Sequence, residues 1–201
     1  ATLQLLMSSD PGRIEKAVIT NAEAYDQWPS KPELPYLKMI VNPVTSPLMF
    51  HAMRNGAIQR EVFSIAVEDK ATITPAIAAA YSLPHVATPE RWQRLRRFFA
   101  WQLDEAHNDI TLTALPAMRT FDRPVLLMWG ERDANFGPEL ARRLARDIRG
   151  AQGIEFLKAS QHMPMQEEDA GYAAAALAFL KDGTVSDEAR AELARARAGP
   201  P

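Results

Sequence analysis

The strongest structural signal in the sequence is an alternation of strand and helix patterns between residues 122 and 181. The segment "PVLLMWG" is a continuous apolar run, typical of a central strand covered on both faces. In "GPELARRLARDIRG", an early proline, one apolar face and a glycine past the end predict a helix. "GIEFLKA" is the next strand pattern and "EEDAGYAAAALAFL" the next helix pattern. Short links between such elements imply parallel strands with covering helices, so we expect an α/β fold.

The remainder of the chain divides into three zones of different texture. Residues 1–28 are typical of a helix, a turn and a buried strand, "AVIT". Residues 29–121 hold most of the 15 prolines, and their apolar positions recur at helical spacing, which predicts several short helices. Residues 182–201 contain one helical segment from Ser186 that, apart from Leu193, has little to bury. We therefore expect a loosely held tail there.

The clearest helix of the proline-rich zone begins at "TPERWQRLRRFFAWQLDEA", where Thr88 is a good N-cap and Pro89 suits the first helical position. Its apolar stripe consists of Trp92, Leu95, Phe99 and Leu103. Its cationic residues off that stripe are Arg91, Arg94 and Arg97. Because the aromatic residues follow the core-facing period, the pattern favours a surface helix with a solvated cationic edge over a nucleic-acid-binding helix.

Composition narrows the class of protein further. The 201 residues are 47% hydrophobic and 24% charged with a net charge of −2, which argues against binding nucleic acid through general phosphate attraction. The absence of cysteine excludes disulfides, thiolate metal sites and a cysteine nucleophile within these residues. No apolar run reaches the length of about 18 residues that a membrane span requires. We expect a cytoplasmic protein that does not bind nucleic acid or membranes.

No metal or cofactor site stands out in the sequence. None of the four histidines pairs with another ligand at helical i,i+4 spacing, and no glycine-rich phosphate loop is present. These histidines are His51, His85, His107 and His162. We therefore expect neither a metal nor a cofactor.

Two chemically capable residues follow neighbouring strand patterns. Asp133 comes shortly after "VLLMWG", and His162 comes shortly after "GIEFLKAS". Functional groups of open α/β sheets collect beyond the carboxyl ends of the strands, so these two side chains project from the same edge if the strands are neighbours. A carboxylate beside an imidazole fixes its tautomer and stabilises the imidazolium, which prepares the other ring nitrogen for proton transfer.

The stretch "RPVLLMWGERDANFGPELARRLA…GIEFLKASQHMPMQEED" resembles the C-terminal half of the α/β-hydrolase fold, in its epoxide-hydrolase, haloalkane-dehalogenase and esterase branch. That family has a W-G-x-x-D stretch after its penultimate strand and a G-H-x-x-x-x-E stretch after its last. The resemblance implies that Asp133 is the triad acid, His162 the triad base and Glu167 the acidic residue that opens the final helix. Gln161 stands where the family usually has glycine, which alters the turn into His162.

The opening segment is similar to the helix and strand that follow the family's nucleophile elbow, G-x-S-x-G-G or G-x-D-x-G-G. The resemblance implies that Ala1 comes directly after the elbow glycines and that the nucleophile and oxyanion hole lie upstream. Neither elbow pattern occurs within these residues, and Ser8 and Ser9 end a helix rather than follow a strand. We therefore expect this chain to hold two-thirds of a triad and to lack turnover by itself.

By the same resemblance, residues 1–28 and 122–181 form the hydrolase core, and residues 29–121 form a helical cap, or lid, over the active site. Such lids supply an apolar wall, which implies a small, largely apolar substrate. The candidates for this wall are Trp28, Phe50, Tyr81, Trp92 and Phe136. For any single one of them a core role competes with ligand contact, and Phe136 has the best claim because it follows Asp133 closely.

The substrate class stays open because it depends on the nucleophile. Serine would act on an ester-like carbonyl, whereas aspartate would open an epoxide or displace a halide. "NAEAYDQWPS" after the first strand is similar to members with an aspartate elbow, which slightly favours the second class. Epoxide opening would need lid tyrosines, here Tyr36 and Tyr81. Glu23 or Asp26 could replace Asp133 as the acid, as in some dehalogenases, although the W-G-x-x-D context favours Asp133.

Two other classes of function remain open. One is a non-catalytic protein that binds a small apolar ligand under the lid. The other is an interaction module that docks through the arginine-rich helix or the Ala/Arg-rich tail. The sequence indicates no oligomeric state.

Overall fold

The computed structural model describes residues 2–27, 29–107 and 109–199, and it divides into two compact units. The first unit combines residues 1–28 with residues 109–201, and the second is Pro29–Asn108. The first unit contains the strands β1 (Ala17–Thr20), β2 (Val125–Gly130) and β3 (Ala151–Leu157). Its helices are α1 (Thr2–Ser9), η1 (Pro11–Arg13), α7 (Ile110–Thr113), α8 (Leu115–Thr120), α9 (Pro138–Asp147), α10 (Pro164–Glu167), α11 (Asp169–Asp182) and α12 (Asp187–Ala198).

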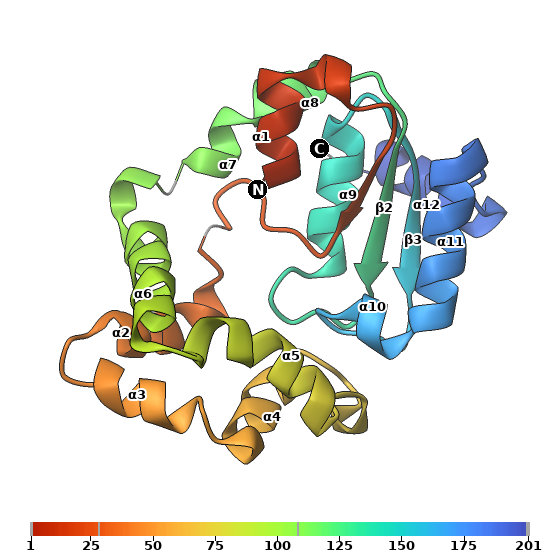
Figure 1. Cartoon of the computed structure of the whole chain (residues 1–201). Helices are drawn as coiled ribbons and strands as arrows, with labels where there is room; N and C mark the ends of the chain where they lie inside the picture. The colour runs from red at the N-terminus through yellow and green to blue at the C-terminus, as the bar shows by residue number, and fades with distance from the viewer. Residues whose placement is uncertain (1, 28, 108, 200–201) are drawn as a thin grey trace. The chain divides into compact units, whose positions relative to one another are not determined.

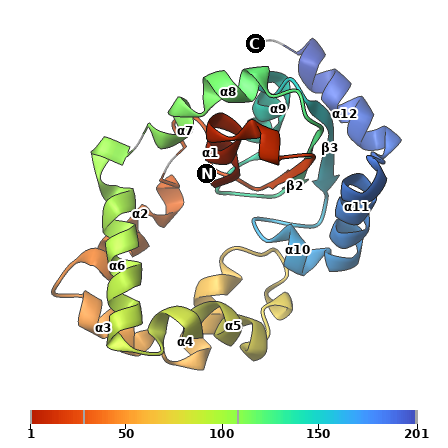
Figure 2. The same ribbon diagram turned by 45° about the horizontal axis from the view of Figure 1, so that its top comes forward.

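The three strands form one parallel sheet in the order β1-β2-β3, which confirms the predicted α/β class. β2 lies in the middle and every one of its residues is buried, as its continuous apolar run predicts. Leu127 and Trp129 belong to the core cluster formed with α1, α8 and α9, whereas Leu126 and Met128 pack with Phe179 of α11. Figures 1 and 2 show α9 and α11 on opposite sides of the sheet.

The C-terminal helix α12 differs from the loosely held tail expected for residues 182–201. It contacts β3 and α9, and it buries Leu193 together with Ala189, Ala196 and part of Glu192. Gly153 of β3 permits this close approach, because a Cβ there would lie 2.6 Å from Val185 and 3.1 Å from Ala189. The interface between α12 and β3 consists mainly of small residues. The prediction of a loose tail considered large apolar side chains and therefore missed it.

Replacing Leu193 by alanine is expected to lower the free energy of unfolding by about 2–3 kcal/mol, because Leu193 is 6% exposed within the core cluster. Leu177 on α11 is 67% exposed, so Leu177→Ala is a matched control with an expected change below about 0.5 kcal/mol. Urea unfolding followed by circular dichroism measures both. Equal effects in the two variants would show that α12 is held as loosely as its sequence predicts.

Residues 109–121 were expected in the lid but belong to the first unit. Ala114 and Met118 are 1% and 0% exposed, and both lie with Phe121 in the core cluster that covers the sheet. The apolar periodicity of this stretch predicts helices, as observed, but it does not indicate which core they join.

The loop after β1 is fixed by Tyr25, which adopts a positive φ of 56°. Its hydroxyl donates to Asp147 Oδ2 at 2.7 Å, and the Arg143 guanidinium carbon lies 3.7 Å from the centroid of its ring. The backbone carbonyl of Tyr25 accepts a hydrogen bond of 2.5 Å from Thr111. Burial and the bond to Asp147 raise the pKa of the phenol above its ordinary value. These contacts tie the loop to α9 and α7.

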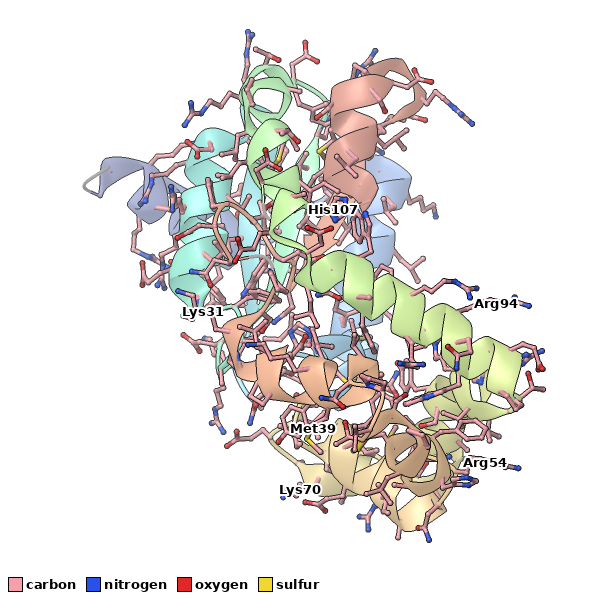
Figure 3. The ribbon with its side chains drawn as sticks, turned by 90° about the vertical axis from the view of Figure 1, so that its left-hand side faces the viewer. Lys31, Met39, Arg54, Lys70, Arg94 and His107 are labelled. Carbon is pink, nitrogen blue, oxygen red and sulfur yellow. The ribbon has the colours of Figure 1, made fainter. Side chains whose placement is uncertain are left out.

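The second unit is entirely helical within its described residues. Its elements are η2 (Lys31–Glu33), α2 (Leu34–Val41), α3 (Ser46–Ala52), α4 (Gly56–Ser64), η3 (Lys70–Thr72), α5 (Pro75–Val86), α6 (Pro89–Leu103) and η4 (Glu105–His107). The Trp92 indole N–H donates to Ser46 Oγ at 3.0 Å, and Arg96 donates to the carbonyls of Ile40 and Val41 at the end of α2. Arg94 and Arg54 extend outward from this unit in Figure 3, and both are exposed.

Candidate active site

Three loops carry polar side chains to one edge of the sheet. Asn21 follows β1, Asp133 follows β2 and His162 follows β3. Because the strands are parallel, their carboxyl ends lie at the same edge, and the three residues meet there through hydrogen bonds. The edge therefore combines a carboxylate, an imidazole and an amide from three separate parts of the sequence.

Asp133 is a buried carboxylate with four hydrogen-bond partners, two at each oxygen. Oδ2 accepts from Asn21 Nδ2 at 2.5 Å and contacts His162 Nδ1 at 3.0 Å. Oδ1 accepts from the backbone N–H groups of Asn135 at 2.8 Å and Phe136 at 3.1 Å. The side chain has no exposed surface, so these donors replace its hydration. Three of these partners are amide N–H groups that can only donate, whereas the role of His162 Nδ1 depends on the tautomer of its ring.

The surroundings of Asp133 fix the tautomer of His162. An ionised carboxylate only accepts, so Nδ1 carries the proton and Nε2 presents a lone pair when the ring is neutral. The His162 side chain is 27% exposed while that of Asp133 is wholly buried. An arriving molecule can thus reach the imidazole but not the acid. A buried carboxylate in this position can orient an accessible imidazole for proton transfer.

The loop after β2 is held in shape by Trp129. Its indole N–H donates to the carbonyl of Phe136 at 2.6 Å, while the N–H of Phe136 donates to Asp133. The Phe136 ring lies against His162 with 5.6 Å between ring centroids. Phe136 is 4% exposed and so gives the imidazole one apolar neighbour.

The loops after β2 and β3 cross at Gly130. The N–H of Glu131 donates to the Leu157 carbonyl, and that of Arg132 donates to the Ser160 carbonyl, both at 3.0 Å. A Cβ at Gly130 would overlap the Gln161 carbonyl oxygen and lie 2.8 Å from the Ser160 carbonyl oxygen. The glycine in "WGERD" is therefore required by the close approach of two backbones.

Two glutamates shape the turn that leads into His162. Glu167 Oε2 accepts the N–H of Gln161 at 2.7 Å, and Glu168 Oε1 accepts from Ala159 N and Ser160 Oγ. Glu167 ends the short helix α10 instead of opening α11, which differs from the expectation for that residue. Among the described residues other than glycine, only Asn21 and Tyr25 have a positive φ. Gln161, at the position where the resemblance implies glycine, therefore does not adopt the left-handed backbone that would favour glycine.

The other predicted site residues lie elsewhere. The carboxylate at Nδ1 of His162 is that of Asp133. The backbone carbonyl of Glu23 accepts from Gln4 Nε2 at 2.8 Å, and Asp26 is exposed. Trp28 lies outside the described residues. The remaining wall and lid candidates belong to the second unit: Tyr36, Phe50, Tyr81 and Trp92.

Within the second unit, Phe50 and Trp92 lie together, with 5.8 Å between their ring centroids. Trp92 is 3% exposed and its indole is bonded to Ser46, so it serves as a core residue of this unit. Tyr81 is 38% exposed and packs on Phe63.

Sequence reasoning missed Asn21 and Trp129. Asn21 directly follows its strand pattern, "AVIT", as the predicted acid and base follow theirs within a few residues, and that placement is the signal that could have identified it. In the sequence, Trp129 resembles any other apolar strand residue. Only the hydrogen bond from its indole to the Phe136 carbonyl shows that it holds the loop after β2.

The described residues contain no group of three or more His, Cys, Asp or Glu side chains placed to hold a metal ion. Among the same residues, no helix combines the length and apolar character needed to cross a bilayer.

The fold of this chain is similar to that of solved α/β hydrolases. The haloalkane dehalogenase DbjA, in a mutant form, matches 98% of this chain and 65% of its own, with a TM-score of 0.64 and 17% identity. The lip1 protein of Acinetobacter baumannii AYE, named as a lipase, matches 89% of this chain and 56% of its own, with a TM-score of 0.52 and 15% identity. No family model matches the sequence, and no curated protein matches it significantly.

These likenesses establish the fold. The chain spans 56% to 65% of the length of the two solved chains and has part of the α/β-hydrolase fold, as its sequence predicts.

Proposed function

We propose that this chain supplies the acid, the base and the helical cap of an α/β hydrolase whose nucleophile is carried by a segment outside these residues. The observation that carries the proposal is the hydrogen bond of 3.0 Å between buried Asp133 and partly exposed His162 at the carboxyl edge of the sheet. This chain together with the nucleophile-bearing segment is called the complete enzyme below.

In the complete enzyme, His162 moves the proton at Nε2. With a serine nucleophile, Nε2 takes the hydroxyl proton as the serine oxygen attacks an ester carbonyl, and it later returns that proton to the leaving alcohol. With an aspartate nucleophile, a carboxylate oxygen displaces the leaving group at carbon. Nε2 then takes a proton from the water that hydrolyses the resulting alkyl-enzyme ester. In both cases the Asp133 carboxylate accepts from Nδ1–H and stabilises the imidazolium.

The substrate we propose is a small, largely apolar ester, epoxide or haloalkane. The ring of Phe136 supports the apolar character of the substrate, because it packs against the His162 imidazole within the first unit. The helical second unit is the proposed cap. An aspartate nucleophile is slightly favoured by the sequence "NAEAYDQWPS" after β1.

The first test is the coding sequence immediately before the Ala1 codon. We expect an in-frame elbow, G-x-S-x-G-G or G-x-D-x-G-G, and hydrolysis by the complete enzyme but not by the 201-residue chain alone. A genuine start codon at that point, with no turnover of simple esters, epoxides or haloalkanes, would contradict the proposal and favour a non-catalytic ligand-binding protein.

A single-turnover reaction in H₂¹⁸O distinguishes the two nucleophiles. An aspartate nucleophile gives the product alcohol its own unlabelled carboxylate oxygen, because water attacks the carbonyl carbon of the ester intermediate. A serine nucleophile gives a labelled carboxylic acid, because water attacks the acyl group of the substrate. Mass spectrometry of the product reads the difference.

A further inference from the structure

Asn21 lies where the three site loops meet. Its Oδ1 accepts the N–H of Gly130 at 3.0 Å, and its Nδ2 donates to Asp133 Oδ2 at 2.5 Å and to the Gln161 carbonyl at 3.3 Å. One side chain thus contacts the end of β2, the acid that follows it and the residue before His162. Asn21 is 6% exposed, so these bonds form away from solvent.

The orientation of the Asn21 amide is fixed by its partners. The N–H of Gly130 can only donate, so the amide oxygen faces it and the amide nitrogen faces Asp133 and the Gln161 carbonyl. The reversed amide would set N–H against N–H and oxygen against carboxylate. The side chain therefore directs its N–H groups to the Asp133 carboxylate and the Gln161 carbonyl in a single orientation.

The backbone of Asn21 is also specific. Its φ of 35° lies in the left-handed region, which asparagine tolerates better than most residues other than glycine. The loop after Asn21 is anchored at two points: Gln4 Nε2 donates to the carbonyl of Glu23, and Tyr25 donates to Asp147. The loop that carries Asn21 is therefore held by contacts other than the one with the acid.

We propose that Asn21 is a positioning residue that holds Asp133 against His162, so that Nδ1 of the neutral imidazole keeps its proton and Nε2 is presented as the base. Its catalytic value rests on the function proposed above. The pairing that it controls is a property of the folded chain and can be measured without turnover.

The test is the tautomer of neutral His162, read from ¹⁵N NMR shifts of the imidazole in the full 201-residue chain. In the unsubstituted chain we expect the Nδ1–H form to predominate. Asn21→Gly removes the amide while its backbone accepts the positive φ, and it should make the Nε2–H form, which free histidine prefers, the major one. In the complete enzyme, the same substitution should lower kcat about 10²-fold with little change in KM.

Two further variants separate positioning from a loss of stability. Gln4→Ala removes a buried side-chain bond to the same loop without touching Asp133, so it should leave the tautomer unchanged. Asn21→Ala loses the same amide as Asn21→Gly but tolerates φ of 35° less well, so it should be less stable and show the same tautomer shift.

The outcomes distinguish this inference from the function on which it rests. An unchanged His162 tautomer in folded Asn21→Gly would overturn the positioning role, and so would a shift that follows stability across the three variants. The proposed function fails separately, if turnover of the complete enzyme does not depend on His162.

Discussion

His162→Ala is expected to lower kcat of the complete enzyme by about 10⁴-fold or more, because turnover with either nucleophile includes a step in which His162 takes a proton. Asp133, Asn21 and the backbone around them stay in place, so KM should change much less. The matched control is His85→Ala on α5, which removes an exposed imidazole from the second unit and should leave kcat unchanged. A loss below tenfold at His162 would contradict its role as the base.

The same variant also reports the nucleophile. If the nucleophile is aspartate, it attacks without a base, and only the hydrolysis of the alkyl-enzyme ester requires His162. His162→Ala should then accumulate a covalent intermediate, visible as a mass increase of the intact protein. If the nucleophile is serine, its activation requires His162, and no such adduct should build up.

Gly130→Ala is expected to lower the free energy of unfolding by about 3 kcal/mol or more, because the new methyl group overlaps backbone instead of a flexible side chain. The atoms in its way are the carbonyl oxygens of Gln161 and Ser160. To make room, the loop after β3 must move away from β2, and His162 moves with it. The NMR signal of the His162 Nδ1 proton should therefore weaken in whatever fraction remains folded.

Gly171→Ala is the control for that substitution. Gly171 lies on α11 with no atom within 4 Å of a Cβ there, and alanine is favoured over glycine in a helix by about 1 kcal/mol. It should therefore be neutral or stabilising in the same urea titration. Similar destabilisation of both variants would show that the close approach at Gly130 relaxes at little cost.

The sequence predicted the parts of this molecule that depend on local pattern. The continuous apolar run predicted the central strand β2, because a strand buried on both faces is apolar at every position. The stripe of Leu140 and Leu144 predicted α9, because a helix buried on one face has apolar residues at helical spacing. The pairing of Asp133 with His162 was also predictable, since parallel strands bring the ends of successive strand patterns to one edge.

What the sequence did not predict depends on contacts between distant segments. The function of Asn21 arises from bonds to residues more than 100 positions away. α12 was underestimated because alanines pack against a glycine in β3, and neither residue type registers as a strong apolar signal. The boundary of the second unit was misplaced because α8 has the same helical spacing as the helices before it but packs on the sheet.

The parallel pairing of β1 with β2 affects the order in which the first unit folds. Ala17 pairs with Val125, whereas Val125 pairs with Ala151, so the first ladder closes a far longer stretch of chain than the second. The entropy of closing a loop rises with its length, and folding slows as contacts become less local. β2, α9 and β3 are therefore expected to assemble first and β1 to dock later. Asn21, which follows β1, would complete the bonds of Asp133 only in that last step.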